Sequence, residues 1–211
     1  MADEPGPVTA SELRHRMANL FQLLTTTARM RIQRCPDAAA RLKLGWLLEA
    51  IGVVGVLQHR LLSPDGENFA LLLEEMLAQW RRRGAAAGIT VELDAEPVRV
   101  REQSLSALAL IAHELTFNAF THAFADGRTG QIRLELRRLD EDSAAFTVAD
   151  DGCGYDPQAI PADTLGLWLL KGLVGQVRGR MTTNAGPGGV AVRVEFQAPA
   201  SDPAIPLTGA P

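Results

Sequence analysis

The chain has 211 residues, 46% of them hydrophobic and 22% charged, which is the composition of an ordinary globular protein that can bury a core. Its formal net charge of -4 favours neither nucleic acid nor an anionic membrane surface as a partner. Cys35 and Cys153 are too few for a disulfide framework, and no apolar run is long enough to cross a bilayer. The acidic, proline-bearing start is no signal peptide, so we expect a cytoplasmic protein without membrane insertion.

Two helices are predicted at the amino-terminal end. Residues 11–34 and 38–62 carry apolar residues at helical spacing, and Pro36 between them disfavours helical geometry. Two such helices cannot cover both of their apolar faces alone. We therefore expect residues 11–63 to form a helical hairpin that pairs with a second copy, as a homodimer built on a four-helix bundle. Residues 1–10 are expected to be a flexible leader.

A single histidine lies in the first of these helices. His15 is two residues from both Leu13 and Met17, which belong to the apolar stripe of the helix. This spacing predicts that the imidazole points away from the stripe, toward water. A neutral imidazole can attack an electrophile such as the γ-phosphorus of a nucleotide. A solvated surface histidine without a chemical role is the competing interpretation.

A second domain is predicted over residues 67–197, after a turn at residues 63–66. Apolar residues at helical spacing alternate there with stretches in which apolar and polar residues take turns. The predicted helices are residues 69–83, 105–124 and 165–178, and the predicted strands are 90–93, 98–100, 131–139, 144–149 and 190–196. Helices interleaved with hairpin-linked strands predict an α+β sandwich, with helices on one face of a mixed or antiparallel sheet. Residues 198–211 are expected to be a flexible tail.

Three polar residues share one face of the predicted helix 105–124. Glu114, Asn118 and His122 follow one another at intervals of four residues. A carboxylate and an amide aligned in this way supply the oxygen ligands that Mg²⁺ takes together with substrate phosphates. An ordinary hydrogen-bonded helix face has the same spacing, so this pattern alone leaves both interpretations open.

Two glycine motifs follow along the chain. Asp150 directly follows a predicted strand and opens the motif Asp-x-Gly-x-Gly, whose glycines are Gly152 and Gly154. Such glycines let the backbone turn sharply and approach a ligand, and the carboxylate can accept a hydrogen bond from an amino group such as that of adenine. Gly166 and Leu167 open the next helix, where free N–H groups favour phosphate. A tight turn and an ordinary helix start are the competing interpretations.

The order of these motifs resembles the ATP-binding domain, of the GHKL type, that histidine kinases share with DNA gyrase, a heat-shock chaperone and MutL. Residues 113–124, HELTFNAFTHAF, are similar to the N box of that family, which usually reads close to NELVTNALKHAF. Residues 12–22, ELRHRMANLFQ, are similar to the phosphoacceptor box of HisKA_2/HWE-like histidine kinases, which reads roughly EIHHRVKNNLQ. The resemblance extends over residues 11–197.

This resemblance implies an ATP-dependent protein histidine kinase with ATP and Mg²⁺ as cofactors. His15 would accept the phosphoryl group and pass it to an aspartate of a response-regulator receiver domain, and a separate sensor protein would supply the signal. Asn118 would bind Mg²⁺, and Glu114 would help to position the metal or polarise the attacking imidazole. The remaining residues that the resemblance assigns to the nucleotide site are His122, Asp150, Gly152, Gly154, Gly166 and Leu167.

The chain departs from the family pattern at positions that are usually basic or polar. Thr121 replaces a lysine of the N box, Trp168 replaces an arginine after Leu-Gly-Leu, and Val190 replaces a threonine beside the adenine site. These losses weaken the electrostatic stabilisation on which phosphoryl transfer depends. Two other functions therefore stay open. One is a histidine phosphotransferase that shuttles phosphate between receiver domains with a degenerate ATP site, and the other is an anti-sigma-type switch whose nucleotide site controls partner capture.

Overall fold

The computed structural model describes residues 10–61, 65–155 and 165–199 of the chain. Its backbone divides into two compact units, Met1–Gln58 and His59–Pro211. Most of the predicted leader and tail lies outside the described residues. Within the described ranges, no helix combines the length and the apolar character needed to span a membrane.

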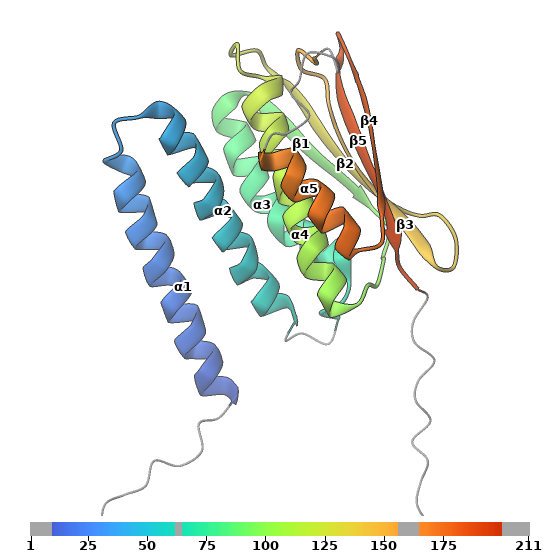
Figure 1. The fold of residues 1–211 in the computed structure, drawn as a ribbon, viewed down its shortest axis with the longest axis horizontal. Helices are drawn as coiled ribbons and strands as arrows, with labels where there is room; N and C mark the ends of the chain where they lie inside the picture. Colours follow the sequence, from blue (N-terminus) through green and yellow to red (C-terminus); the bar gives the residue numbers. More distant parts are fainter. Residues whose placement is uncertain (1–9, 62–64, 156–164, 200–211) are drawn as a thin grey trace, which may run out of the picture. The chain divides into compact units, whose positions relative to one another are not determined.

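The amino-terminal unit consists of two long helices (Figure 1). Helix α1 is Ala10–Gln33 and helix α2 is Ala38–Leu61, so α2 runs across the boundary between the units. Pro36 lies in the break, and the Arg41 N–H donates to the Asp37 carbonyl oxygen at 2.9 Å in the first turn of α2. Both predicted helices are confirmed to within one residue at each end, whereas the dimeric four-helix bundle stays a prediction.

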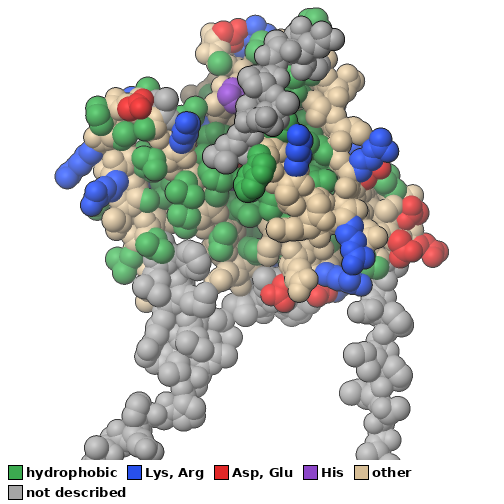
Figure 2. All heavy atoms as spheres, viewed as in Figure 1, with side chains coloured by type: hydrophobic (Ala, Val, Ile, Leu, Met, Phe, Trp, Pro, Cys, Tyr) green, Lys and Arg blue, Asp and Glu red, His purple; other side chains and the backbone are tan. Residues whose placement is uncertain are grey.

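Large apolar side chains of this unit are exposed to solvent. The space-filling view shows apolar side chains gathered on the surface of these two helices (Figure 2). The exposed fractions range from 39% to 64% for Leu23, Leu24, Met30, Leu42, Leu44 and Leu47. Several large apolar side chains exposed on one pair of helices are typical of a protein interaction site.

The second unit is an α+β sandwich whose helices lie on one face of a five-stranded sheet (Figure 1). The helices are α3 (Phe69–Ala87), α4 (Glu102–Asn118) and α5 (Leu165–Gln176). The strands are β1 (Ile89–Ala95), β2 (Gly130–Arg138), β3 (Ser143–Asp150), β4 (Arg180–Gly186) and β5 (Gly189–Gln197). They are ordered β1-β2-β3-β5-β4, with β1 parallel to β2 and the other pairs antiparallel. The sheet is therefore mixed, which is one of the two arrangements that the sequence predicted.

The core of this unit lies between the sheet and the helices. Phe69, the first residue of α3, is fully buried and meets the rings of Phe146 and Phe196 edge-on, at centroid distances of 5.5 and 6.0 Å. The start of α3 is capped by Asn68, whose side chain accepts a hydrogen bond from the Ala70 N–H at 3.1 Å. The cap and the aromatic cluster hold α3 against the strands.

Two elements of this unit differ from the sequence prediction. Strand β4 was not predicted, because most of its side chains are exposed and it forms an edge of the sheet, so apolar alternation is missing. Residues 98–100 were predicted as a strand, but Arg99 makes only an isolated bridge with Asn68. The missed strand lacks the local pattern, whereas the isolated bridge of Arg99 is to a residue distant in sequence, which local patterns do not report.

Candidate functional site

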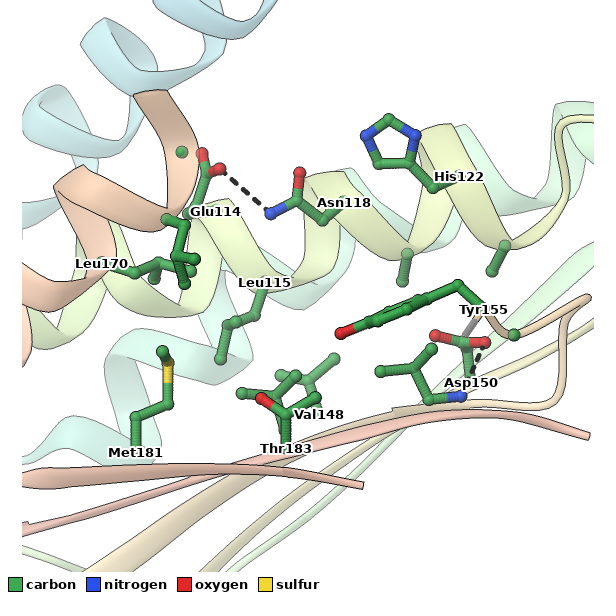
Figure 3. A pocket seen from close by; sticks show the side chains of 17 residues that line it. Glu114, Leu115, Asn118, His122, Val148, Asp150, Tyr155, Leu170, Met181 and Thr183 are labelled. Carbon is green, nitrogen blue, oxygen red and sulfur yellow. Dashed lines mark hydrogen bonds between the residues drawn. The ribbon is translucent and has the colours of Figure 1, made fainter. Parts of the chain in front are cut away.

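A cavity of about 600 Å³ lies between the helices and the strands β3, β4 and β5 of the second unit (Figure 3). Most of its wall is apolar, and a few polar side chains converge on it, as in sites that bind small molecules. The lining residues are Glu114, Leu115, Asn118, Ala119, His122, Ala123, Val148, Asp150, Gly154, Tyr155, Gly166, Leu167, Leu170, Met181, Thr183, Val190 and Val192.

Glu114 and Asn118 form a hydrogen-bonded pair on α4. The amide Nδ2 of Asn118 donates to Oε1 of Glu114 at 3.0 Å, and Glu114 is only 4% exposed. An ionised carboxylate can only accept hydrogen bonds, so the pair turns the amide nitrogen of Asn118 toward Glu114 and its oxygen away. Figure 3 shows this orientation. The amide oxygen of Asn118 is thus the group that this pair presents to a ligand.

Helix α4 continues directly into a π-helical turn, η1, at Ala119–Ala123. The Ala119 N–H reaches the carbonyl oxygens of both Leu115 and Thr116, where the wider turn begins. A π-helical turn rotates the residues that follow it relative to an α-helix, and such turns are frequent at functional sites. His122 lies on this turn and lines the cavity together with Glu114 and Asn118. The common face predicted for the three residues is therefore present, although the predicted uniform α-helix is not.

The carboxylate of Asp150 is held at the end of β3 by two backbone N–H groups. Its Oδ1 accepts hydrogen bonds from the N–H of Gly152 at 3.1 Å and of Val190 at 3.3 Å. Partial burial raises the pKa of Asp150 above its ordinary value, these two hydrogen bonds lower it, and the nearby Asp151 raises it. Because both bonds end on Oδ1, Oδ2 is the oxygen that this arrangement leaves for a ligand.

The glycines of the Asp-x-Gly-x-Gly motif are required by close backbone packing. A Cβ at Gly152 would overlap Ala123 of η1, and a Cβ at Gly154 would overlap the carbonyl group of Gly186 in the β4–β5 hairpin. Gly154 also has φ +61°, which favours glycine. The loop after Asp150 is therefore packed tightly between η1 and the β4–β5 hairpin.

The start of α5 packs against Glu114 with no room for a side chain. A Cβ at Gly166 would lie 2.5 Å from Oε1 of Glu114. Gly166 therefore lets the first turn of α5 approach the Glu114–Asn118 pair. The first turn of α5, whose N–H groups favour anions, thus lies beside the Glu114–Asn118 pair.

The structure brings most of the predicted site residues together. Those that line the cavity are Glu114, Asn118, His122, Asp150, Gly154, Gly166 and Leu167. Gly152 packs behind the loop instead. His15 belongs to α1 in the other unit, and its side chain lies outside the described part of the chain, so its predicted orientation stays a prediction. The chemical role of each of these residues also stays a prediction.

Several lining residues were missed by the sequence prediction. Met181 and Thr183 belong to β4, which was not predicted at all. Tyr155 directly follows Gly154, and its place after the glycine motif was the signal that could have identified it. Two residues that depart from the family pattern lie in different places. Val190 lines the cavity, whereas Trp168 on α5 is 71% exposed.

The donor chemistry of the cavity fits Mg²⁺ only together with a phosphorylated ligand. The described residues contain no group of three or more His, Cys, Asp or Glu side chains that could hold a metal ion. The described lining residues also include no lysine or arginine. The amide oxygen of Asn118 is a hard ligand of the kind that Mg²⁺ accepts, and Mg²⁺ commonly takes its remaining ligands from phosphates and water.

Comparison with known sequences identifies a domain family and several similar proteins. Residues 74–196 match the family model of the histidine kinase-like ATPase domain. Blue-light-activated histidine kinase 1 of Erythrobacter litoralis is 24% identical over 192 residues, which are 88% of this chain and 51% of that protein. Blue-light-activated histidine kinase 2 of the same organism is 28% identical over 121 residues, 54% of this chain and 33% of that protein. The chain thus spans about half and about a third of these curated relatives.

Solved structures share the fold. The histidine kinase domain of the E. litoralis EL346 blue-light-activated histidine kinase superposes with a TM-score of 0.65 at 19% identity, over 83% of this chain and 95% of that one. The longer EL346 structure gives a TM-score of 0.67 at 18% identity, over 92% of this chain and 62% of that one. The family match covers more than half of the chain and contains every residue that lines the cavity. The chain therefore belongs to the histidine kinase-like ATPase domain family.

Proposed function

We propose that this protein is an ATP-dependent protein histidine kinase that autophosphorylates on His15 and transfers the phosphoryl group to a response-regulator aspartate. The observation that carries the proposal is the convergence of two prearranged oxygen ligands on one largely apolar cavity. Asn118 is oriented by Glu114, and Asp150 is oriented by two backbone N–H groups. Preorganised groups of this kind bind a ligand without reorganisation when it arrives.

The base of ATP would lie at the strand side of the cavity. The free oxygen of Asp150 would accept a hydrogen bond from the exocyclic amine of adenine, and Val148 and Val190 would contact the ring. Only Oδ2 of Asp150 would contact the base, because Oδ1 already accepts hydrogen bonds from the N–H groups of Gly152 and Val190. Asp150 would thus recognise adenine through one hydrogen bond, from the exocyclic amine to Oδ2.

The phosphates would lie toward the start of α5 and Asn118. Gly166 and Leu167 are in the first turn of α5, where N–H groups favour negative charge. Mg²⁺ would be held by the amide oxygen of Asn118 and by phosphate oxygens, and it would neutralise charge on the phosphates. Glu114 is a positioning residue in this proposal, because its carboxylate holds the amide of Asn118.

The acceptor would be the imidazole of His15. A ring nitrogen would attack the γ-phosphorus while the bond to the β,γ-bridging oxygen breaks, so that ADP leaves and a phosphohistidine remains. The phosphoryl group would then pass to a carboxylate oxygen of a receiver-domain aspartate, which regenerates the neutral imidazole. The support for His15 is its box of neighbouring residues and its place within α1.

The two units would have different functions. Residues 11–63 would form the dimerisation and phosphoacceptor domain, and residues 67–197 the catalytic domain. The exposed apolar side chains of α1 and α2 support a homodimer, because a second copy would cover them. A receiver domain would be the phosphate acceptor, a separate sensor protein the input, and the cytoplasm the location.

Incubation of the purified full chain with γ-labelled ATP and Mg²⁺ tests the proposal. We expect acid-labile label on the wild type, and none on His15→Ala or Asn118→Ala. His59→Ala is the matched control, because it removes another histidine and should keep the label. Label that enters His15 only from a phosphorylated receiver domain would favour the phosphate shuttle, and no label from either donor would favour a binding role.

A further inference from the structure

The guanidinium group of Arg83, near the end of α3, lies over two aromatic rings of the neighbouring helix. Its Cζ is 4.8 Å from the ring centroid of Phe117 and 4.8 Å from that of Phe120. Both rings are buried, with exposed fractions of 7% and 9%. A cation within about 6 Å of a ring centroid is attracted by the ring, more strongly where water is excluded. The two contacts therefore hold the end of α3 against the helix that carries the rings.

The two rings lie on either side of a change in helix type. Phe117 belongs to the last turn of α4, whereas Phe120 belongs to the π-helical turn η1. Because π-helical turns are rare and occur mostly as single turns inside α-helices, we expect this one to need support from its surroundings. Arg83 contacts both sides of the junction, so its side chain can stabilise η1 against a return to regular α-helix.

Arg83 is itself held in place by the packing of α3. The next residue, Gly84, lies so close to the start of β1 that a Cβ there would overlap the carbonyl oxygen of Ile89. Gly88 ends the helix with φ +71°, and its N–H donates to the Gly84 carbonyl oxygen. The backbone at Arg83 is therefore fixed relative to β1. A planar guanidinium group on this backbone can stack on ring faces, as an ammonium group cannot.

We propose that Arg83 is a positioning residue that maintains the π-helical turn and thereby the place of His122 in the cavity. An α-helix and a π-helix differ in the number of residues per turn, so the direction of His122 relative to Asn118 depends on which form residues 119–123 adopt. Figure 3 shows the two side chains side by side along the helix. Arg83 does not line the cavity, so it acts through this turn. The consequence for nucleotide binding rests on the proposed function.

Nitrogen-15 NMR of the full chain labelled at histidine tests the positioning without any nucleotide. The chain has four histidines, and His122→Ala identifies the resonances of His122. Arg83→Met keeps a long side chain but removes the charge, and we expect it to shift these resonances because η1 relaxes. Arg82→Met, at an exposed neighbouring position, should leave them in place. His122 resonances that are the same in Arg83→Met and in the wild type would overturn the inference.

A second pair of variants tests whether the cation and the ring act together. Phe120→Leu keeps apolar cover without the ring face, so it should shift the His122 resonances in the same direction as Arg83→Met. Arg83→Met should then shift them less in Phe120→Leu than in the wild type. Fully additive shifts would contradict the contact as the cause. If Arg83→Met does not fold, Arg83→Lys takes its place in the same comparison, because lysine lacks the planar group.

Isothermal titration with ADP measures the consequence for the site. Arg83→Met should bind ADP about fivefold or more weakly than the wild type, and Arg83→Lys should lie between the two. His122→Ala should weaken binding less in Arg83→Met than in the wild type, because both changes act through the same side chain. Equal ADP affinity in Arg83→Met and the wild type would overturn the inference. If the wild type binds no ADP, the proposed function is wrong, and the NMR comparison alone decides the role of Arg83.

Discussion

The two units differ in where they place their apolar side chains. In the second unit, Phe69 and Phe146 are completely buried between a sheet and a layer of helices. In the first unit, side chains such as Leu23 and Met30 remain 64% and 60% exposed. A sheet covered by helices can bury a core within one chain, whereas a pair of helices needs a further surface. We therefore expect the second unit to be stable by itself and the first unit to need a partner.

Replacement of a core aromatic residue in the second unit should have the largest effect on the free energy of unfolding. Phe69→Ala removes a ring that contacts two other phenylalanines, and we expect it to lower the free energy of unfolding by about 3–5 kcal/mol. Chemical denaturation followed by circular dichroism measures the change. Met30→Ala on α1 is the control, with an expected loss below about 0.5 kcal/mol in dilute, monomeric protein. Equal losses of stability from both variants would contradict the proposed difference between the two units.

A substitution in the glycine loop after Asp150 tests whether the tight packing of this loop is needed for nucleotide binding as well as for stability. Gly154→Ala combines a φ of +61° with overlap of the Gly186 carbonyl group, and we expect a loss of about 1–3 kcal/mol of stability together with weaker ADP binding. Gly188→Ala in the neighbouring hairpin is the matched control, since a Cβ there meets nothing within 4 Å. Thermal unfolding and ADP titration provide the two readouts. Normal binding by Gly154→Ala would show that the loop is not part of the site.

Self-association should depend on the first unit alone. Leu44, which is 39% exposed on α2, should become buried in a homodimer. We expect Leu44→Ser to weaken the dimer by about 1 kcal/mol or more for each copy, which sedimentation equilibrium at micromolar concentration can measure. Leu139→Ser, at a 44% exposed position in the second unit, should leave association unchanged. A monomeric wild type would reject the dimer and the proposed dependence of the first unit on a partner.

The smallest effect is expected from the pH dependence of Asp150. Burial raises the pKa of this carboxyl above its ordinary value of 3.8, so the native state holds the proton more tightly than the unfolded state. Its contribution to stability therefore falls as pH rises from 3.8 through the raised native value, and it is constant above that value. Asp150→Asn keeps an oxygen for the Gly152 and Val190 N–H groups but does not titrate.

Urea unfolding of the wild type and of Asp150→Asn at several pH values measures this difference. The stability of the Asn variant relative to the wild type should rise with pH across the window in which Asp150 titrates. A difference that falls with rising pH would mean that the two N–H bonds outweigh burial. Above this window ADP binding should be weaker in the variant than in the wild type, because an amide does not offer the two acceptor oxygens of an ionised carboxylate.

The candidate site could be predicted from sequence to the extent that it depends on local spacing. Glu114 and Asn118 are four residues apart on a helix, and this spacing is enough to place them side by side and to produce their hydrogen bond. The sharp backbone turn at Gly154 was likewise predicted from a motif within a few residues, and its φ of +61° agrees with it. Thr183 could not be found in this way, because its strand pairs with β5 at the sheet edge and carries no apolar alternation of its own.

The sequence by itself determined the helices, most strands, the α+β class and the order of the motifs, because periodicity and turn residues act over short distances. Only the tertiary structure decided that β4 lines the cavity and that Gly166 approaches Glu114. These contacts join segments far apart in the chain. They follow from the packing of helices on a sheet, which local sequence patterns do not encode.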